Sequence, residues 1–267
     1  GVGKASLARS IHFGSDRYEA PFIEIDCHGM PGETLRQELL GYEQGAIPGS
    51  LQAYAGAFQR AQGGTIYFNE VCDLSIELQG VLVKFIQSGE VQRIGASAAI
   101  PADVRIIAST QHDPDKARKK ACLREDLYYA LAITRIDVPP LRMRDTDVMR
   151  LAEAFLHEFK ARHDRTQVSM SQDFKDVLIE SSWPGNVRQL RNVIEHALIM
   201  STDGTLTPKE LPEEILASRW VRKPDLLTEE VILATLNRTH NNRSEAAELL
   251  GVGRTTLWRA MKKLGID

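Results

Sequence analysis

Long apolar runs are missing from this sequence. No segment approaches the roughly 20 consecutive apolar residues that a membrane-spanning helix needs, and no signal peptide is visible. An excess of one charge is missing too, because the formal net charge is −3 over 267 residues. The chain as a whole is therefore no electrostatic partner for nucleic acid, and any basic surface must be local. We expect a cytoplasmic protein without a membrane partner.

Cysteine is scarce. Cys27, Cys72 and Cys122 lie far apart and lack metal-ligand spacing, and the seven histidines show no zinc pattern. This excludes a disulfide-stabilised scaffold and is typical of a reduced protein with ordinary buried thiols. What is present is the composition of a globular protein, with 43% hydrophobic and 26% charged residues, and the length allows about two domains.

The first half of the chain alternates between short apolar runs and amphipathic helical patterns. Strands are predicted over 21–26, 63–70 and 103–110, and helices over 5–13, 32–40 and 74–88. This alternation favours a parallel α/β sheet, which binds ligands at the carboxyl ends of its strands. Asn69 and Glu70 follow one strand and Gln111 follows the next. Taken alone, the Asn69-Glu70 pair is also compatible with a strand that ends in solvent.

The sequence begins with Gly1-Val2-Gly3-Lys4, and a helical pattern follows at once. This matches the end of G-x-x-x-x-G-K-[ST], in which backbone N–H groups and a helix N-terminus hold phosphates and the lysine reaches the β and γ oxygens. Ala5 lacks the hydroxyl that helps to hold magnesium in that motif. A glycine-rich linker is the alternative, and we expect the sequence to be a fragment of a longer protein.

Pro139-Pro140 ends the α/β pattern and predicts a domain boundary. Helical patterns follow over 146–163, over 171–181 and after Trp183-Pro184-Gly185-Asn186. We expect Asn186 to cap the last of these helices, with Gln189 in a near capping box. Arg188 in its first turn opposes the helix dipole, which indicates an external anion; a neighbouring carboxylate is the alternative.

The C-terminal residues predict a helix-turn-helix. Helical patterns over 227–239, 243–250 and 254–264 are combined with a tight turn at 251–253. The third helix is basic and carries no acid. The candidate DNA-binding residues are Arg243, Arg254, Thr255, Thr256, Arg259, Lys262 and Lys263. A basic helix that merely faces solvent is the alternative.

With these pieces in this order, the chain resembles the bacterial enhancer-binding proteins, which are sigma-54-dependent activators. The most specific matches lie at 183–192, 123–129 and 139–142, and the similarity covers essentially the whole chain. The resemblance implies an AAA+ α/β P-loop core over 1–140, a helical lid subdomain and linker over 141–220, and a Fis-type all-α helix-turn-helix domain over 221–267.

The resemblance also implies roles for single residues. The nucleotide-binding positions are Gly1, Gly3 and Lys4 of the Walker A loop and Arg188 of the second sensor. The catalytic positions are Asn69 and Glu70 of the Walker B pair, Gln111 of the first sensor and Arg124, an arginine finger for the neighbouring subunit. Asn69 and Glu70 would also hold Mg²⁺ through the nucleotide. The loop that contacts the sigma factor corresponds to Gly45, Ala46, Ile47, Pro48, Gly49 and Ser50.

Several positions of hydrolysis and sigma contact depart from the family pattern. Asn69 replaces an aspartate, the ligand type that Mg²⁺ favours, and Gln111 replaces an asparagine. Asp26 replaces the asparagine that holds the catalytic glutamate, and a carboxylate there would repel Glu70. Ala130 replaces an arginine of the subunit interface. In the loop, Ile47 and Pro48 replace Phe and Thr.

These features predict an ATP- and Mg²⁺-binding, sequence-specific transcription regulator with weakened ATP hydrolysis and weakened sigma-54 contact. A fully active ATPase that remodels the sigma-54 holoenzyme is the alternative, and a non-transcriptional AAA+ assembly ATPase is a rival from another class. We expect double-stranded DNA, a sigma factor and further copies of the chain, as a dimer or hexamer, to be its partners. Family members respond to a phosphorylation or ligand signal, which this sequence does not identify.

Overall fold

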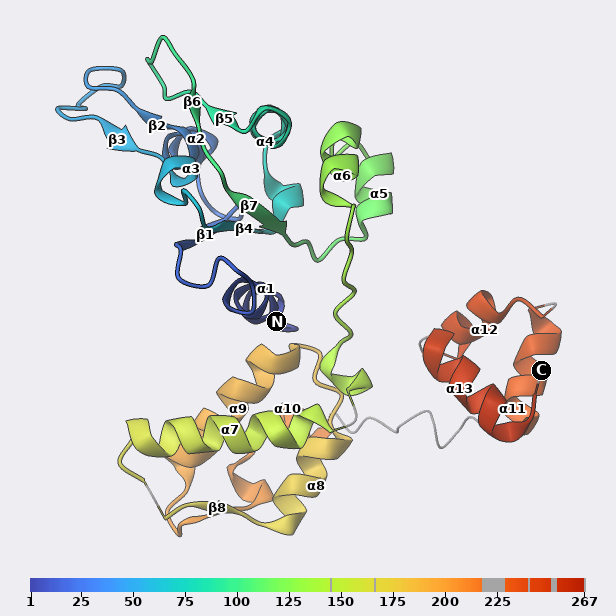
Figure 1. Cartoon of the computed structure of the whole chain (residues 1–267). Coiled ribbons are helices and arrows are strands. Elements are labelled where there is room, and N and C mark those ends of the chain that lie inside the picture. Colours follow the sequence, from blue (N-terminus) through green and yellow to red (C-terminus); the bar gives the residue numbers. More distant parts are fainter. Residues whose placement is uncertain (145, 166, 218–228, 240, 251–253, 267) are drawn as a thin grey trace. The chain divides into compact units, whose positions relative to one another are not determined.

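The computed structural model describes residues 1–144, 146–165, 167–217, 229–239, 241–250 and 254–266 (Figure 1). The chain divides into two compact units, one of Gly3–Val138 and one of Gly1–Val2 with Pro139–Asp267. Three separate apolar cores stabilise the described part: one in the α/β region, one in the helical region after Pro140 and one in the last three helices. No described helix is long and apolar enough to cross a membrane.

A three-stranded parallel sheet forms the centre of the Gly3–Val138 unit. β4 (Thr65–Asn69) lies between β1 (Phe22–Asp26) and β7 (Arg105–Ala108). The first four residues of β4 are buried, as expected for a central strand covered on both faces. The register pairs Asp26 with Asn69, so the polar ends of two strands lie side by side. The predicted parallel α/β fold is confirmed.

Gly64 allows β4 to start next to β1. A Cβ atom on Gly64 would lie 2.0 Å from the carbonyl oxygen of Pro21, and the preceding Gly63 has a φ of +75°. Side chains at these two positions would collide or strain the backbone. The Gly-Gly pair therefore fixes where the strand begins and, with it, where Asn69 and Glu70 emerge.

Helices and two short hairpins surround this sheet. The helices are α1 (Lys4–Phe13), α2 (Gly32–Leu40), α3 (Ala57–Arg60), the 3-10 turn η1 (Val71–Asp73), α4 (Ile76–Ser88), α5 (Pro114–Lys119) and α6 (Glu125–Leu131). The hairpins pair β2 (Gly41–Tyr42) with β3 (Tyr54–Ala55) and β5 (Glu90–Val91) with β6 (Ile100–Pro101). Phe58, Phe68 and Leu82 are fully or almost fully buried in their common core.

The helical region after Pro140 has its own core around Trp183. Its elements are η2 (Leu141–Met143), α7 (Asp147–Arg162), β8 (Ser169–Met170), α8 (Gln172–Glu180), α9 (Asn186–Met200), β9 (Thr205–Leu206), η3 (Pro208–Glu210) and α10 (Glu213–Ala217). The Trp183 side chain is fully buried, and its indole N–H donates to the Leu178 carbonyl oxygen at 2.8 Å. The indole thereby fills the core and leaves no polar atom unsatisfied.

The prediction that Asn186 caps α9 is wrong. The N-cap is Gly185, and Asn186 is the first helical residue, with a φ of 54°. Asparagine tolerates this left-handed conformation, and its Oδ1 accepts the Leu141 N–H at 2.8 Å. Gln189 reaches back as expected, but to the N–H of Gly185, at 2.9 Å. Asn186 therefore joins η2 to α9 instead of capping its own helix.

The three C-terminal helices are α11 (Glu229–Arg238), α12 (Arg243–Leu249) and α13 (Arg254–Leu264). Ile232, Leu236, Leu257 and Met261 are buried in their shared core, together with two alanines of α12. The predicted helix-turn-helix is confirmed as a set of helices, while the expected turn at 251–253 lies outside the described residues.

Trp183→Ala tests the core of the helical region. Because the indole is fully buried and hydrogen-bonded, we expect the substitution to lower the free energy of unfolding by about 3–5 kcal/mol. Urea unfolding followed by circular dichroism measures it. Ile133→Ala is the control, because Ile133 is 87% exposed and its loss should cost less than about 0.5 kcal/mol. Equal effects of the two substitutions would contradict the assignment.

Candidate functional site

Three predicted site residues meet at the carboxyl end of β4. The Lys4 ammonium forms an ion pair with Oε1 of Glu70. Oε2 of Glu70 accepts the backbone N–H of Gln111 at 2.7 Å. Glu70 follows β4 and Gln111 lies just beyond β7, so the parallel pairing of these strands brings them together. Glu70 has a φ of 59°, which turns the chain sharply at this point.

Gln111 takes part in this arrangement through its backbone. Its side chain is exposed, and its amide N–H, which any residue except proline would supply, is the group that bonds Glu70. The expected role of the Gln111 side chain in positioning water therefore stays a prediction.

Asn69 is held by two hydroxyl groups that the sequence analysis missed. Its Oδ1 accepts from the Tyr67 hydroxyl at 3.3 Å and from the Ser109 hydroxyl at 3.4 Å, and these hydroxyls lie 2.8 Å apart. Residues 67 and 69 share one face of β4 because side chains alternate along a strand. That spacing was available in the sequence, whereas Ser109 directly follows the neighbouring strand β7, so its proximity depends on the strand register.

The start of α1 is suited to an anion. The helix follows Gly3, which has a φ of 99°; no side chain caps it, and its first turn carries no acidic residue. The first helical bond runs from the Leu7 N–H to the Gly3 oxygen, so the N–H groups of residues 4–6 lie before the helical ladder. Together with the Lys4 ammonium, these groups offer positive charge and hydrogen-bond donors to a phosphate.

Carboxylates gather near this end of the sheet. Burial, together with the negative charges of Asp26, Asp73 and Glu70, raises the pKa of the Cys27 thiol to about 12. Asp26 is exposed, and its Oδ1 accepts the His28 N–H at 3.1 Å. Several like charges therefore act on one buried thiol, in addition to its burial. The expected repulsion between Asp26 and Glu70 stays a prediction.

Arg124 lies at the start of α6, and its side chain bonds to Asp126 rather than to Glu70. Its guanidinium makes two hydrogen bonds to Asp126, at 3.0 and 2.7 Å, and this partner raises the pKa of Arg124. Its backbone N–H donates to the buried Gln79 side chain at 2.8 Å. The Gln79 amide also donates to the carbonyl oxygens of Leu74 and Cys122. Gln79, which the sequence analysis missed, thus joins α4 to the segment that carries Arg124.

The loop 45–50 is a closed turn. The Gly45 N–H donates to the Ser50 carbonyl oxygen at 3.0 Å, and the Ser50 hydroxyl donates to the Ile47 oxygen at 2.8 Å. Ile47, one of the expected sigma-contact residues, is only partly exposed, whereas Leu51 just after the loop is 84% exposed. The most exposed large apolar side chain of this region is therefore Leu51 rather than Ile47.

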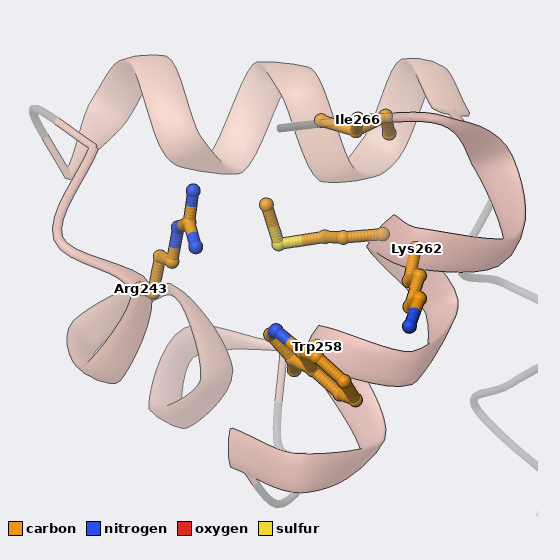
Figure 2. Close-up of a pocket in the computed structure, with 5 residues that line it drawn as sticks. Arg243, Trp258, Lys262 and Ile266 are labelled. Atoms are coloured by element: carbon orange, nitrogen blue, oxygen red, sulfur yellow. The ribbon is translucent and has the colours of Figure 1, made fainter.

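The helix-turn-helix carries a basic and aromatic surface. Arg243, Trp258, Met261, Lys262 and Ile266 line a pocket of about 220 Å³ (Figure 2). Figure 2 shows Arg243 on one side of it and Lys262 on the other, with Trp258 between them. The Lys262 ammonium lies 5.2 Å from the centre of the Trp258 ring, which is a cation–π distance. Trp258 is 51% exposed and was missed by the sequence analysis.

Arg259 is also exposed on α13. The side chains of Arg254, Thr255, Thr256 and Lys263 lie outside the described part of the structure, although their backbone belongs to α13. Arg188 is exposed in the first turn of α9, as expected, and its backbone N–H donates to the Gly1 oxygen at 3.3 Å.

Three domain families match the chain. Residues 1–137 match the Sigma-54 interaction domain, residues 142–225 the AAA+ ATPase lid domain, and residues 229–264 the bacterial regulatory protein, Fis family. The chain belongs to the sigma-54-dependent enhancer-binding proteins.

Full-length relatives extend well beyond this chain. The phenol regulator MopR of Acinetobacter guillouiae is 36% identical over 282 residues, which cover 99% of this chain and 50% of MopR. The transcriptional regulatory protein ZraR of Escherichia coli K12 is 38% identical over 264 residues, or 96% of this chain and 60% of ZraR. The chain therefore spans 50–60% of the length of these curated relatives.

Solved structures of one relative show the same fold. NtrX from Brucella abortus in complex with ADP matches with a TM-score of 0.74 at 30% identity, over 100% of this chain and 63% of that chain. The complex of NtrX with ATP matches with a TM-score of 0.72 at 31% identity, over 99% of this chain and 62% of that chain.

Cysteine reactivity tests the electrostatics of this site. Because the pKa of Cys27 is raised from 9.0 to about 12, its reactive thiolate is about a thousandfold scarcer near pH 8 than that of an unperturbed thiol. We expect iodoacetamide to modify the exposed Cys122 long before Cys27, as measured by peptide mass spectrometry. All three thiols should react in guanidinium chloride, and equally fast labelling of Cys27 and Cys122 in the folded protein would contradict the assignment.

Proposed function

We propose that this protein is an ATP-binding, sequence-specific DNA-binding transcription regulator in which ATP hydrolysis is weakened. The observation that carries the proposal is the Asn69-Glu70 pair at the end of β4. A neutral amide stands where the family has a carboxylate, and the Glu70 carboxylate already has a partner on each of its oxygens.

Nucleotide binding is supported by the start of α1. Lys4 and the N–H groups of the first turn provide the donors that phosphate needs. NtrX, which shares the fold at 30% identity, was crystallised with ADP and with ATP. We propose that Gly1, Gly3, Lys4 and Arg188 bind the phosphates, and that Arg124 acts toward a neighbouring copy in a dimer or hexamer.

Weak hydrolysis follows from the chemistry of the pair. Glu70 is the candidate base for water, and a base must have a free oxygen directed at the water proton. Its oxygens are held by Lys4 and by the Gln111 N–H. A phosphate that attracts Lys4 would release Oε1, so the geometry permits some turnover. At position 26, an aspartate adds negative charge where the family has a neutral, hydrogen-bonding asparagine. At position 130, an alanine stands where the family has an arginine of the subunit interface.

Magnesium fits this site less well than phosphate does. Mg²⁺ favours carboxylate oxygens, and Asn69 offers a neutral oxygen that already accepts from hydroxyls. Among the described residues, no group of three or more His, Cys, Asp or Glu side chains is placed to hold a metal ion. The predicted binding of Mg²⁺ by Asn69 and Glu70 through the nucleotide thus lacks a free carboxylate at the expected position.

DNA binding is supported by the exposed cations of α12 and α13. We propose that Arg243, Arg259 and Lys262, with Arg254, Thr255, Thr256 and Lys263, contact DNA, and that Trp258 packs against the sugar–phosphate backbone. Contact of residues 45–50 with sigma-54 is proposed to be weakened, since Pro48 removes a backbone donor and Ile47 is only partly exposed. An active ATPase that remodels the sigma-54 holoenzyme is the competing function.

ATP turnover separates these two functions. Asn69→Asp, alone and with Asp26→Asn, should raise kcat by about tenfold or more, because a single catalytic-site group typically contributes 10²–10⁴-fold. Both changes fit locally, since a carboxylate at 69 can still accept from Tyr67 and Ser109, and an amide oxygen at 26 can still accept from His28.

The measurement is phosphate release by the natural full-length protein with DNA present. Glu70→Gln is the control that should abolish any turnover. Family-like turnover by the unsubstituted protein, abolished by Glu70→Gln, would favour the active ATPase. No rise in either variant would place the loss elsewhere, with Ala130 as the next candidate.

The salt dependence of DNA binding tests the basic surface. Lys262→Ala should weaken binding to all sequences and reduce the slope of log affinity against log salt by about 1, as expected for a phosphate contact. Fluorescence anisotropy with a labelled operator duplex measures both. Lys84→Ala, an exposed lysine of α4, is the control. Unchanged binding of Lys262→Ala, or no sequence-specific binding at all, would favour the non-transcriptional alternative.

A further inference from the structure

We infer that nucleotide binds at this site almost independently of Mg²⁺. This inference rests on the proposed nucleotide binding and deepens it, since it concerns which charges hold the phosphates. The oxygen atoms near the end of β4 determine which charges these are.

The two residues expected to face the metal carry one carboxylate between them, and each of its oxygens has a protein partner. Glu70 uses Oε1 for Lys4 and Oε2 for the Gln111 N–H. The Asn69 oxygen is uncharged and accepts from Tyr67 and Ser109. A metal bound here would have to displace these partners, which costs free energy. An amide oxygen binds Mg²⁺ less strongly than a carboxylate oxygen and would therefore offset less of that cost.

The neighbouring elements do not make up for this. The first turn of α1 carries no acidic residue, and Ala5 follows the lysine where the general phosphate-loop motif has Ser or Thr. The carboxylates of Asp26 and Asp73 are both bonded to His28, through its backbone N–H at 3.1 Å and its Nδ1 at 3.0 Å. One oxygen of each of these two carboxylates is thus directed to a protein partner.

The positive charge that a phosphate needs is instead supplied by the protein. The Lys4 side chain is 19% exposed and the Glu70 side chain 14%, so this ion pair is partly shielded from solvent. When a phosphate draws Lys4 away, Lys4 exchanges one oxyanion for another, while Glu70 keeps the Gln111 N–H. The uncapped start of α1 adds backbone N–H donors, which can bind the phosphates without a metal ion. The phosphates are therefore neutralised mainly by Lys4 and this helix.

The test compares nucleotide affinity with Mg²⁺ and with EDTA. The probe is a fluorescent ADP derivative, titrated with the natural full-length protein. Because the protein's own groups bind the phosphates, removing Mg²⁺ should change Kd by less than about threefold. In Asn69→Asp, the added carboxylate should make Kd weaken by about tenfold or more on chelation, which is the lower range for changes around a metal site.

Ser109→Ala is the matched control. It removes a hydroxyl beside Asn69 without adding charge, so its binding should stay indifferent to chelation. Thermal unfolding of each variant establishes that the fold is retained. The Asn69→Asp result thereby reports on charge rather than on a disturbed strand end.

Each outcome of the titration is decisive. Binding that weakens by about tenfold or more when EDTA replaces Mg²⁺ in the unsubstituted protein overturns the inference and leaves the proposed function standing. Absence of binding under both conditions overturns the proposed function and the inference with it. If the unsubstituted protein is indifferent to chelation and Asn69→Asp is as well, the independence from Mg²⁺ holds, but its assignment to the neutral side chain of Asn69 is wrong.

Discussion

The ion pair between Lys4 and Glu70 is the interaction on which the candidate site depends. It joins the first turn of α1 to the end of β4, and its two residues are 66 positions apart in the sequence. The pair exists because the parallel sheet places β4 in its centre and because Glu70, at a φ of 59°, turns its carboxylate away from the strand. The Gln111 N–H, just beyond the neighbouring strand, completes the set of contacts to the same carboxylate.

The surroundings of this pair explain why a change of a few atoms matters. Asn69 differs from aspartate by one amide group, yet it replaces an anion at the place where family members assemble a hydrolytic centre. Burial, followed by the nearby carboxylates, raises the pKa of Cys27, so charges at this end of the sheet affect their neighbours. Lys4 and the start of α1 offer positive charge and hydrogen-bond donors at this place, whereas Asn69 offers a neutral oxygen.

The remaining regions are built on cores of their own. Trp183 organises the helical region, and the last three helices pack around residues such as Leu257 and Met261. Mutations at the nucleotide site should therefore leave the helix-turn-helix folded, because no core residue is shared between them. This separation allows a regulator to lose hydrolytic strength while its DNA-binding surface is retained.

The sequence by itself determined the order of strands and helices, the helix-turn-helix and the positions of Asn69 and Glu70, since these follow from apolar periodicity and from local motifs. It misplaced the cap of α9, because Asn186 bonds Leu141, which is 45 residues away. The placement of Trp258 beside Lys262 follows from their i, i+4 spacing on α13. Only the tertiary structure decided which groups touch Glu70 and Asn69, and that Leu51 is more exposed than Ile47. The physical reason is that strand register, loop closure and side-chain packing join distant residues, and such pairings leave no periodic signal in the sequence.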